Sequence, residues 1–296
     1  MMGPVLALGY FDSLHLGHGK LISAAVKFAA ENNASVTVAT FEDGFLRLVG
    51  RDEKEVFLLR ERKPILAKMG VDDVCVFPAD KEFLSQSKEQ FCRRIRDIGP
   101  SAVFVGADYR FGKNAAGDAE YLKNNLGIPT FAVDIFTVDG KKASTSTVRE
   151  LIKKGEIEQA NILLTVPYFI SGNVVEGRRD GRRMNLPTVN ITPEEEKLLP
   201  REGVYAATVN AEGKEYLAVL NVGGHPTFFD DKINVEAHII NFNGDLYGQN
   251  VSVYPHNYLR EIKKFNDKED LKEQIEKDIR KTKEILYDKI RCCGQQ

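Results

Sequence analysis

Two histidines near the start of the chain have the spacing of a phosphate-binding turn. The stretch Gly9-Tyr-Phe-Asp-Ser-Leu-His-Leu-Gly-His18 follows an apolar run of strand type and leads into an Ala- and Leu-containing stretch with helical spacing. His15 and His18 lie three residues apart with Gly17 between them, so both imidazoles can reach one oxyanion while the backbone comes close. Unpaired N–H groups and the helix dipole favour a phosphate at such a helix start. We therefore expect a nucleotide triphosphate here; the alternative is a buried histidine pair that only begins a helix.

A second charged cluster follows another strand-like run. The stretch 105–117 carries Asp108, Arg110 and Lys113 among several glycines. It lies at a carboxyl strand end, where open α/β sheets bind ligands. Asp108 can accept a hydrogen bond from a sugar or ring group, and the two cations can contact phosphates. The alternative is a solvated loop with incidental charge, and this cluster alone does not exclude it.

A third cluster is Ser144-Thr-Ser-Thr-Val-Arg149. It combines hydroxyls and N–H groups at a predicted helix start with an arginine one turn further on. This arrangement is suited to a phosphate, although N-capping of the helix explains the hydroxyls nearly as well.

Polar residues in the second half of the chain suggest a cation site. Thr188 and Asn190 lie two apart on a predicted strand, so both side chains face one side, where their oxygens can hold a hard cation such as Mg²⁺. The loop that begins at Asn221 is rich in Gly and Pro and is suited to closing over phosphates. Glu236 lies in an otherwise apolar strand, and the pattern alone slightly favours a solvent-facing residue over a pocket base.

The elements that must position these residues change type along the chain. The first half alternates short apolar runs with helical patterns, which predicts parallel strands in a doubly wound sheet. The strands are expected at 5–10, 35–41, 73–77, 102–106 and 130–136, and the helices at 19–32, 53–69, 86–98, 117–125 and 144–164. Pro64 is expected to split or kink the second of these helices.

After Pro167 the chain alternates on a period of two, with turn signals between short runs. This pattern predicts an antiparallel β-barrel. Residues 267–290 carry spaced apolar positions among charges and are expected to form an amphipathic helix that packs on the barrel. We place the domain boundary near residue 166.

The composition restricts the class of protein. At 296 residues, with 43% hydrophobic and 28% charged residues, the chain is expected to form two globular domains. The net charge of −2 argues against a nucleic-acid partner, and no apolar run approaches the length of a membrane span. We see no signal peptide and no metal-ligand spacing among the four cysteines, so we expect free thiols and a cytoplasmic protein.

Taken in order, the clusters resemble those of the prokaryotic bifunctional riboflavin kinase/FMN adenylyltransferase family, often called FAD synthetase. The resemblance runs from about Leu6 to about Leu286. It is carried by the motifs Gly-Tyr-Phe-Asp-Ser-Leu-His-Leu-Gly-His, Gly-Ala-Asp-Tyr-Arg-Phe-Gly, Ser-Thr-Ser-Thr-Val-Arg, Arg-Met-Asn-Leu-Pro-Thr-Val-Asn-Ile, Gly-Val-Tyr-Ala, Asn-Val-Gly-Gly-His-Pro-Thr-Phe and Val-Glu-Ala-His.

The resemblance implies a Rossmann-like FMN adenylyltransferase domain over residues 1–166 and a riboflavin kinase β-barrel over residues 167–296. It implies that His15 and His18 contact ATP phosphates and that Glu236 is the base for the riboflavin 5′-hydroxyl, which reverses the solvent-facing interpretation. It assigns ATP or phosphate binding to Gly9, Phe11, Gly17, Asp108, Arg110, Ser146, Thr147, Arg149, Gly181 and Arg182. It assigns the flavin to Asn221 and Arg260, and Mg²⁺ to Thr188 and Asn190.

The implied partners are small molecules: riboflavin, FMN and ATP, with no nucleic acid or membrane and at most weak self-association. Three positions depart from the family pattern. Ser13 stands where the family usually has Gly, residues 42–44 replace an Asp-Pro-His-Pro loop, and Asn185 replaces a Gly. The first two leave an alternative open, a single-activity relative with an impaired adenylyltransferase. A non-catalytic flavin-binding regulatory module is the other alternative.

Overall fold

The computed structural model describes residues 3–134, 136–138, 140–175, 188–223, 234–265 and 267–293. The chain forms two compact units, Met1–Val148 with Leu163–Val166, and Arg149–Ile162 with Pro167–Gln296. The expected boundary near residue 166 coincides with one passage between the units. Residues 149–162, expected in the first domain, group with the second unit instead. The functional boundary itself stays a prediction.

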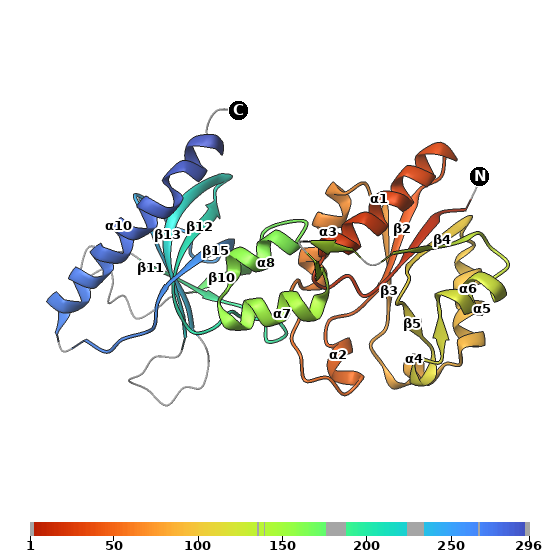
Figure 1. Ribbon diagram of the computed structural model, residues 1–296. Helices are drawn as coiled ribbons and strands as arrows, with labels where there is room; N and C mark the ends of the chain where they lie inside the picture. The colour runs from red at the N-terminus through yellow and green to blue at the C-terminus, as the bar shows by residue number, and fades with distance from the viewer. Residues whose placement is uncertain are drawn as a thin grey trace. The chain divides into compact units, whose positions relative to one another are not determined.

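The first unit combines a sheet with helices (Figure 1). The sheet is parallel and has the strand order β3-β2-β1-β4-β7. Its strands are β1 (Val5–Leu8), β2 (Val36–Phe41), β3 (Asp73–Phe77), β4 (Ala102–Gly106) and β7 (Thr130–Val133). The helices between them are α1 (Leu16–Glu31), α2 (Phe45–Leu48), α3 (Leu59–Lys68), α4 (Lys81–Ser85), α5 (Lys88–Ile98) and α6 (Ala119–Asn125). Helices α7 (Thr145–Lys154) and α8 (Ile157–Leu163) follow, and most of their residues belong to the second unit. The α/β alternation predicted from the sequence is confirmed.

Burial explains why these strands read as continuous apolar runs. Every residue of β1 and β2 is buried, as expected for strands covered on both faces. Helix α1 buries Leu21, Ile22, Ala25 and Ala29, which its 3.6-residue period brings to one face. That face packs on β1, β2 and β4. Two short hairpins complete the unit: β5 (Arg110–Phe111) with β6 (Gly117–Asp118) around a 3₁₀ turn, η1 (Lys113–Ala115), and β8 (Thr137–Val138) with β9 (Lys141–Lys142).

Two predicted helices differ from the structure. The helix expected over 144–164 is divided into α7 and α8 at Gly155, whose φ is +79°. The pattern over 53–69 was expected to be split or kinked at Pro64, but α3 is a single helix from Leu59 to Lys68 that contains Pro64. The first part of the predicted helix, residues 53–58, lies outside it, although its apolar residues Val56, Phe57 and Leu58 are fully buried. Proline interrupts only one backbone hydrogen bond, and the buried Ile65 and Leu66 beside it hold the segment against the unit.

The second unit contains a closed barrel with the strand order β10-β11-β14-β13-β12-β15, and the described pairs are antiparallel. Its strands are β10 (Ile170–Val175), β11 (Thr188–Thr192), β12 (Gly203–Ala211), β13 (Lys214–Gly223), β14 (Asn234–Ile239) and β15 (Asn250–Arg260). Helix α10 (Lys268–Cys293) packs against β12, β13 and β15. The predicted antiparallel barrel and its terminal helix are therefore confirmed.

None of the described helices is long and apolar enough to cross a membrane. Cys75 and Cys92 are free thiols. Cys292 and Cys293 end α10, but their side chains lie outside what the structure describes.

Candidate functional site

The two histidines of the opening motif stack on each other where β1 leads into α1. His15 immediately precedes α1, and its Nδ1 accepts a hydrogen bond from the backbone N–H of His18 at 3.2 Å. The two rings lie 3.7 Å apart between centroids, with 18° between their planes. Since Nδ1 of His15 is an acceptor, the neutral ring carries its proton on Nε2, which makes that nitrogen a donor for an oxyanion.

Glycine is required beside the stacked rings because the backbone approaches them closely. A Cβ at position 17 would lie 2.9 Å from Cε1 and 3.0 Å from Nδ1 of His15. Gly9, directly after β1, leaves room for Phe11 in the same way, since a Cβ there would lie 2.8 Å from the ring of Phe11. Phe11 in turn meets the ring of His18 edge-on at 5.0 Å between centroids. The predicted residues Gly9, Phe11 and Gly17 thus shape the site around the histidine pair.

Both imidazoles are uncharged at neutral pH in the absence of a ligand. Burial lowers the pKa of His15 to about 4, with Asp108 opposing the shift and Lys142 adding to it. Burial also lowers the pKa of His18 well below its ordinary value, and the charges of His15 and Arg62 act in the same direction. A bound phosphate would supply the negative charge that this environment lacks.

Contacts from distant parts of the chain hold the turn between β1 and α1. The N–H of Phe57 donates to the carbonyl of Asp12 at 2.8 Å. Thr165 donates to the carbonyl of Leu14 through its N–H at 3.0 Å and its hydroxyl at 2.8 Å. Leu14 has a φ of +44°, a conformation that costs free energy in a residue other than glycine. The surrounding contacts therefore maintain a backbone that the turn would not hold alone.

The segment before α7 meets the same turn. Ser13 is fully buried, and its hydroxyl lies 2.9 Å from the hydroxyl of Thr145, the first residue of α7. Ser144 Oγ accepts from the N–H of Thr147 at 3.3 Å, as a helix N-cap does. The Thr147 hydroxyl also donates to the carbonyl of Lys142 at 3.3 Å. The third cluster is thus N-capped and in contact with the histidine turn.

The second cluster reaches the same region through strand order. The chain leaves β1 for β2 on one side, and β4 lies on the other side of β1, so β1 and β4 flank the topological switch point of the sheet. The histidine turn follows β1, and Asp108 follows β4. Lys142 Nζ lies 2.7 Å from Asp108 Oδ2, and both charges influence His15. Three clusters predicted separately therefore converge at one sheet edge.

Other predicted phosphate-binding residues are placed differently. Arg110 pairs with Asp118 across the β5–β6 hairpin at 3.0 Å, with both side chains exposed. Ser146 is exposed in the first turn of α7. Arg149 is buried at 3% exposure and belongs to the second unit. Their assignment to ATP stays a prediction.

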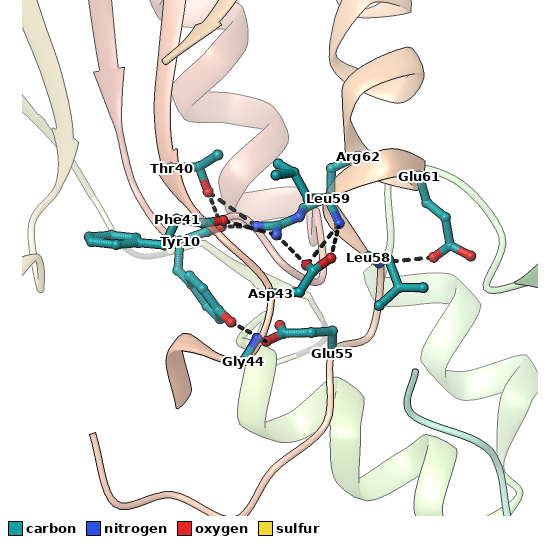
Figure 2. Close-up of polar contacts among 10 residues, drawn as sticks. All are labelled: Tyr10, Thr40, Phe41, Asp43, Gly44, Glu55, Leu58, Leu59, Glu61 and Arg62. Atoms are coloured by element: carbon teal, nitrogen blue, oxygen red, sulfur yellow. Dashed lines mark hydrogen bonds and ion pairs between the residues drawn. The ribbon is translucent and has the colours of Figure 1, made fainter. Parts of the chain in front are cut away.

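A buried arginine closes the ends of β1 and β2 beside this turn (Figure 2). Arg62 is fully buried, and its Nη1 donates to the carbonyl of Tyr10 at 2.8 Å and to Thr40 Oγ1 at 3.1 Å. Its Nη2 donates to the carbonyl of Phe41 at 3.2 Å and to Asp43 Oδ1 at 2.8 Å. One guanidinium therefore satisfies the carbonyls at two strand ends and a carboxylate at once.

The acidic loop that departs from the family pattern is bound to the protein. Asp43 pairs with Arg62 and accepts the N–H of Leu59 at the start of α3, at 2.8 and 3.0 Å. Glu42 accepts the N–H of Ala79 at 3.2 Å. Asp43 therefore does not present an uncompensated charge to an incoming phosphate, which removes one reason to expect an impaired site.

Glu55 is a buried carboxyl in the same cluster (Figure 2). Its Oε1 accepts from the hydroxyl of Tyr10 and from the N–H of Gly44, the latter at 3.1 Å. Burial and the nearby charge of Asp12 raise the pKa of Glu55 to about 7, so this carboxyl is partly protonated at neutral pH. The same burial, together with Glu55, raises the pKa of Tyr10.

The predicted kinase residues form a row across three strands of the barrel. Asn190 on β11 lies directly opposite Glu236 on β14, which in turn lies directly opposite Asn221 on β13. The neighbouring position Val235 is fully buried, whereas Glu236 is only partly buried. Because alternate residues face opposite sides of a strand, the row faces away from the barrel core. Three predicted residues therefore share one polar face.

Thr188 completes this group from the end of β11. Its hydroxyl donates to Glu236 Oε1 at 2.5 Å. Asn190 lies two residues further on the same face, and its Oδ1 accepts from Asn234 Nδ2 at 3.2 Å. Hydroxyl, amide and carboxylate oxygens are thus gathered where strand register alone places them.

A pocket of about 240 Å³ adjoins Thr188. It lies between the ends of β10, β11 and β14 and the loop after β14, and is lined by Val174, Thr188, Val189, Ile239, Phe242, Asn243, Gly244, Asp245, Leu246 and Tyr247. The lining combines apolar side chains with the polar groups of Thr188, Asn243 and Asp245.

Three remaining predictions need separate mention. Arg260 donates to both carboxylate oxygens of Asp278 on α10, at 2.8 to 3.1 Å, so its guanidinium is engaged within the unit. Its assignment to the flavin stays a prediction. Gly181 and Arg182 lie outside the described residues, as does Asn185.

Four features of the first site were absent from the sequence-based account. They are Lys142 beside Asp108, the Ser13–Thr145 contact, Arg62 and Glu55. Only Ser13 carried a signal, because it departs from the family pattern. The others lie in charged stretches of ordinary composition, and only the fold reveals that Arg62 and Glu55 are buried.

Family models match each half of the chain. The model described as FAD synthetase matches residues 2–147, and the model described as riboflavin kinase matches residues 164–286. A solved structure described as a macrolide-efflux protein from Streptococcus pneumoniae is similar with a TM-score of 0.87 and 28% identity, over 95% of this chain and 94% of that chain.

Two curated relatives that match most of the chain carry the same description. The bifunctional riboflavin kinase/FMN adenylyltransferase of Bacillus subtilis is 32% identical, over 93% of this chain and 90% of the relative. That of Escherichia coli K12 is 31% identical, over 93% of this chain and 90% of the relative. The chain therefore belongs to the bifunctional riboflavin kinase/FMN adenylyltransferase family.

Proposed function

We propose that this chain carries out both reactions of its family, the phosphorylation of riboflavin to FMN and the adenylylation of FMN to FAD, each with ATP. The observation that carries this proposal is the presence of two separate polar sites, one in each unit. The stacked histidines lie at the sheet edge of the first unit, and the Asn190–Glu236–Asn221 row lies on the barrel.

In the first unit, we assign FMN adenylylation to the edge with His15 and His18. A phosphate oxygen of FMN attacks the α-phosphorus of ATP, a new phosphorus–oxygen bond forms, and the bond to the β-phosphate breaks to release pyrophosphate. This displacement needs no protein nucleophile. It needs donors aimed at the oxygens on which negative charge develops. Nε2–H of His15 and the N–H groups of the first turn of α1 are such donors.

The low pKa values of the histidines suit this role. A neutral, buried imidazole donates a hydrogen bond without needing a counter-ion in the empty site. When the phosphates of ATP arrive, their negative charge raises the pKa of both rings and strengthens each contact. Lys142, already paired with Asp108, can also turn toward the phosphates.

In the second unit, we assign riboflavin phosphorylation to Glu236. Its carboxylate accepts the proton of the riboflavin 5′-hydroxyl while that oxygen attacks the γ-phosphorus of ATP and ADP leaves. The Thr188 hydroxyl donates a hydrogen bond to Glu236 and so orients the carboxylate. Positioning and charge stabilisation supply most of the rate in phosphoryl transfer, which fits a site defined by strand register.

The same residues fit Mg²⁺. The described part of the chain holds no group of three His, Cys, Asp or Glu side chains suited to a metal ion, so a cation would rely on other oxygens. Thr188 Oγ1 keeps its lone pairs for a cation while its hydroxyl donates a hydrogen bond to Glu236, and Asn190 adds an amide oxygen. When bound, Mg²⁺ neutralises charge on the transferred phosphates.

The cytoplasm is the compartment that we assign. Cys75 and Cys92 are free thiols, which suits a reducing environment.

A product time course tests the proposed function. Purified protein supplied with riboflavin and MgATP should accumulate FMN first and then FAD, and supplied with FMN and MgATP it should release FAD and pyrophosphate. Omission of Mg²⁺ should stop both. Absence of both products, or FMN without any FAD, would contradict the dual activity.

A further inference from the structure

Ser13 lies at the contact between two segments, the histidine turn to which we assign ATP phosphates and the start of α7, to which the family resemblance assigns them. On one side is the turn that ends in His15 and begins α1, and on the other is the first turn of α7. Ser13 is fully buried, and its Oγ lies 2.9 Å from Thr145 Oγ1. The two residues are 132 positions apart in the sequence, so this contact depends on the fold.

A second close approach shows that the two segments pack together. A Cβ at Gly17 would lie 3.6 Å from the carbonyl oxygen of Ala143, two residues before Thr145. The segment from Ala143 to Thr147 therefore passes over the histidine turn at two points. The packing at Gly17 sets the distance between the histidine turn and the segment before α7. The hydroxyl pair of Ser13 and Thr145 sets where along the turn α7 begins.

The register matters because Thr145 begins α7. The next residues, Ser146 and Thr147, are those to which the family resemblance assigns phosphate binding. Thr147 is itself held by Ser144 and by the carbonyl of Lys142. A movement of Thr145 is therefore transmitted to the hydroxyls and N–H groups of this turn and to the backbone of Lys142.

We propose that Ser13 is a positioning residue for adenylyl transfer, which holds the start of α7 against the histidine turn through its hydroxyl contact with Thr145. The proposal rests on the proposed function of the first unit. Ser13 then supports adenylylation, whereas its departure from the family pattern suggested an impaired adenylyltransferase.

The test measures both activities of the intact chain in Ser13→Ala, Thr145→Val and the double variant. Each single variant removes one hydroxyl of the pair. We expect kcat/KM for ATP in FMN adenylylation to fall roughly five- to tenfold, the factor that corresponds to one lost hydrogen bond. The KM for FMN and the riboflavin kinase rate should stay within about twofold. The double variant should lose no more than either single variant, because only one contact exists to lose.

Two matched variants separate positioning from general stability. Thr145→Ser keeps the hydroxyl and should retain the adenylylation rate. Thr130→Val removes another buried hydroxyl of the same unit, one that donates to the carbonyl of Ile128 at 2.9 Å at the start of β7. That position lies at the opposite end of the strands, so adenylylation should be unchanged.

Several results would overturn the inference. They are unchanged adenylylation in Ser13→Ala and Thr145→Val, additive losses in the double variant, or an equal loss in Thr130→Val. If Ser13→Ala loses the kinase activity as well, the Thr145→Ser and Thr145→Val pair decides, since equal activities in these two would contradict the contact. Failure of the unmodified chain to make FAD is a different outcome, which would contradict the proposed function itself.

Discussion

The two candidate sites are constructed in different ways. In the first unit, the histidine turn is held by side chains and backbone groups from far along the chain, including Phe57, Thr145 and Thr165. In the second unit, the row through Glu236 is set by the hydrogen-bonded register of three neighbouring strands. The first site depends on many individual contacts, and the second depends on the backbone pairing of β11, β14 and β13.

This difference predicts how each site responds to substitution. Changes outside the first site, at residues that contact no substrate, should impair adenylylation because they release the turn. In the barrel, only residues of the polar face should matter strongly, since strand register survives most single substitutions. Each prediction below tests one side of that comparison.

The largest effect is expected for Glu236→Gln. The amide cannot accept the proton of the riboflavin hydroxyl, so FMN formation should fall by about 10²- to 10⁴-fold. Conversion of FMN to FAD should be unchanged. Glu215→Gln, an exposed glutamate on β13, is the matched control and should affect neither rate. Equal loss of both activities in Glu236→Gln would argue against separate sites.

The next effect concerns the stability of the first unit. Arg62→Met leaves Asp43 and the acceptors at the ends of β1 and β2 without their buried donor. Loss of one partner from a buried charge pair costs about 3–5 kcal/mol, and the partial exposure of Asp43 places this pair toward the lower value.

Urea titration of both activities measures this loss. Adenylylation should disappear at a lower urea concentration in Arg62→Met, while kinase activity keeps its midpoint. Arg110→Met removes an exposed pair and should change either midpoint little, since such pairs contribute about 0–1 kcal/mol. A shift of the urea midpoint in Arg110→Met as large as that in Arg62→Met would contradict the stronger contribution of the buried pair.

A smaller effect is expected for Gly17→Ala. Alanine favours the helix by up to about 1 kcal/mol over glycine, so α1 should not be weakened. The new Cβ would nevertheless lie 2.9 Å from the ring of His15 and displace it. Adenylylation should fall about 10- to 100-fold without loss of stability, as expected for a displaced contact. A variant with full adenylylation activity would show that the ring position is unimportant.

The pH dependence of Glu55 gives the smallest effect. Its pKa is raised to about 7 from an ordinary value of 4.5, so the folded state binds more protons than the unfolded state between these values. The stability that it contributes is therefore present below about pH 4.5 and is lost as pH rises through 7. Glu55→Gln should be more stable than the unmodified chain at pH 8, by about 1–3 kcal/mol, and this difference should shrink at pH 5.

Unfolding of the first unit, followed by the urea midpoint of adenylylation at each pH, measures this difference. Glu42→Gln, an exposed glutamate directly after β2, is the control and should show no such trend. The histidines make the stability depend on pH in the opposite direction. The pKa of His15 is lowered to about 4 from 6.5, so its contribution grows as pH rises across that interval. A stability gain for Glu55→Gln that is larger at pH 5 would contradict the account.

The comparison also explains what the sequence could predict. Strand β1 was predictable because burial on both faces gives a continuous apolar run, and the barrel strands were predictable because burial on one face gives a period of two. Thr188 and Asn190 could be placed on one face because residues two apart on a strand share a face, whereas Glu236 was assigned by the family resemblance and against the residue pattern. Their alignment across β11, β13 and β14 then follows from register.

The first site was predictable only in part. His15, Gly17 and His18 are local in sequence, so their spacing revealed the turn. Ser13, Glu55 and Arg62 act through partners many residues away, and their burial depends on how the segments before α3 and α7 fold back. No local pattern distinguishes these residues from exposed polar residues, and the helix expected over residues 53–58 was wrong for the same reason.

The central claim is that each unit holds one complete site, and complementation tests it most directly. His18→Ala should make FMN from riboflavin but little FAD, and Glu236→Gln should make FAD only when FMN is supplied. Mixed together with riboflavin and MgATP, the two variants should restore FAD formation, because FMN released by one chain is adenylylated by the other. A mixture that accumulates FMN without FAD, or that makes neither product, would contradict the account.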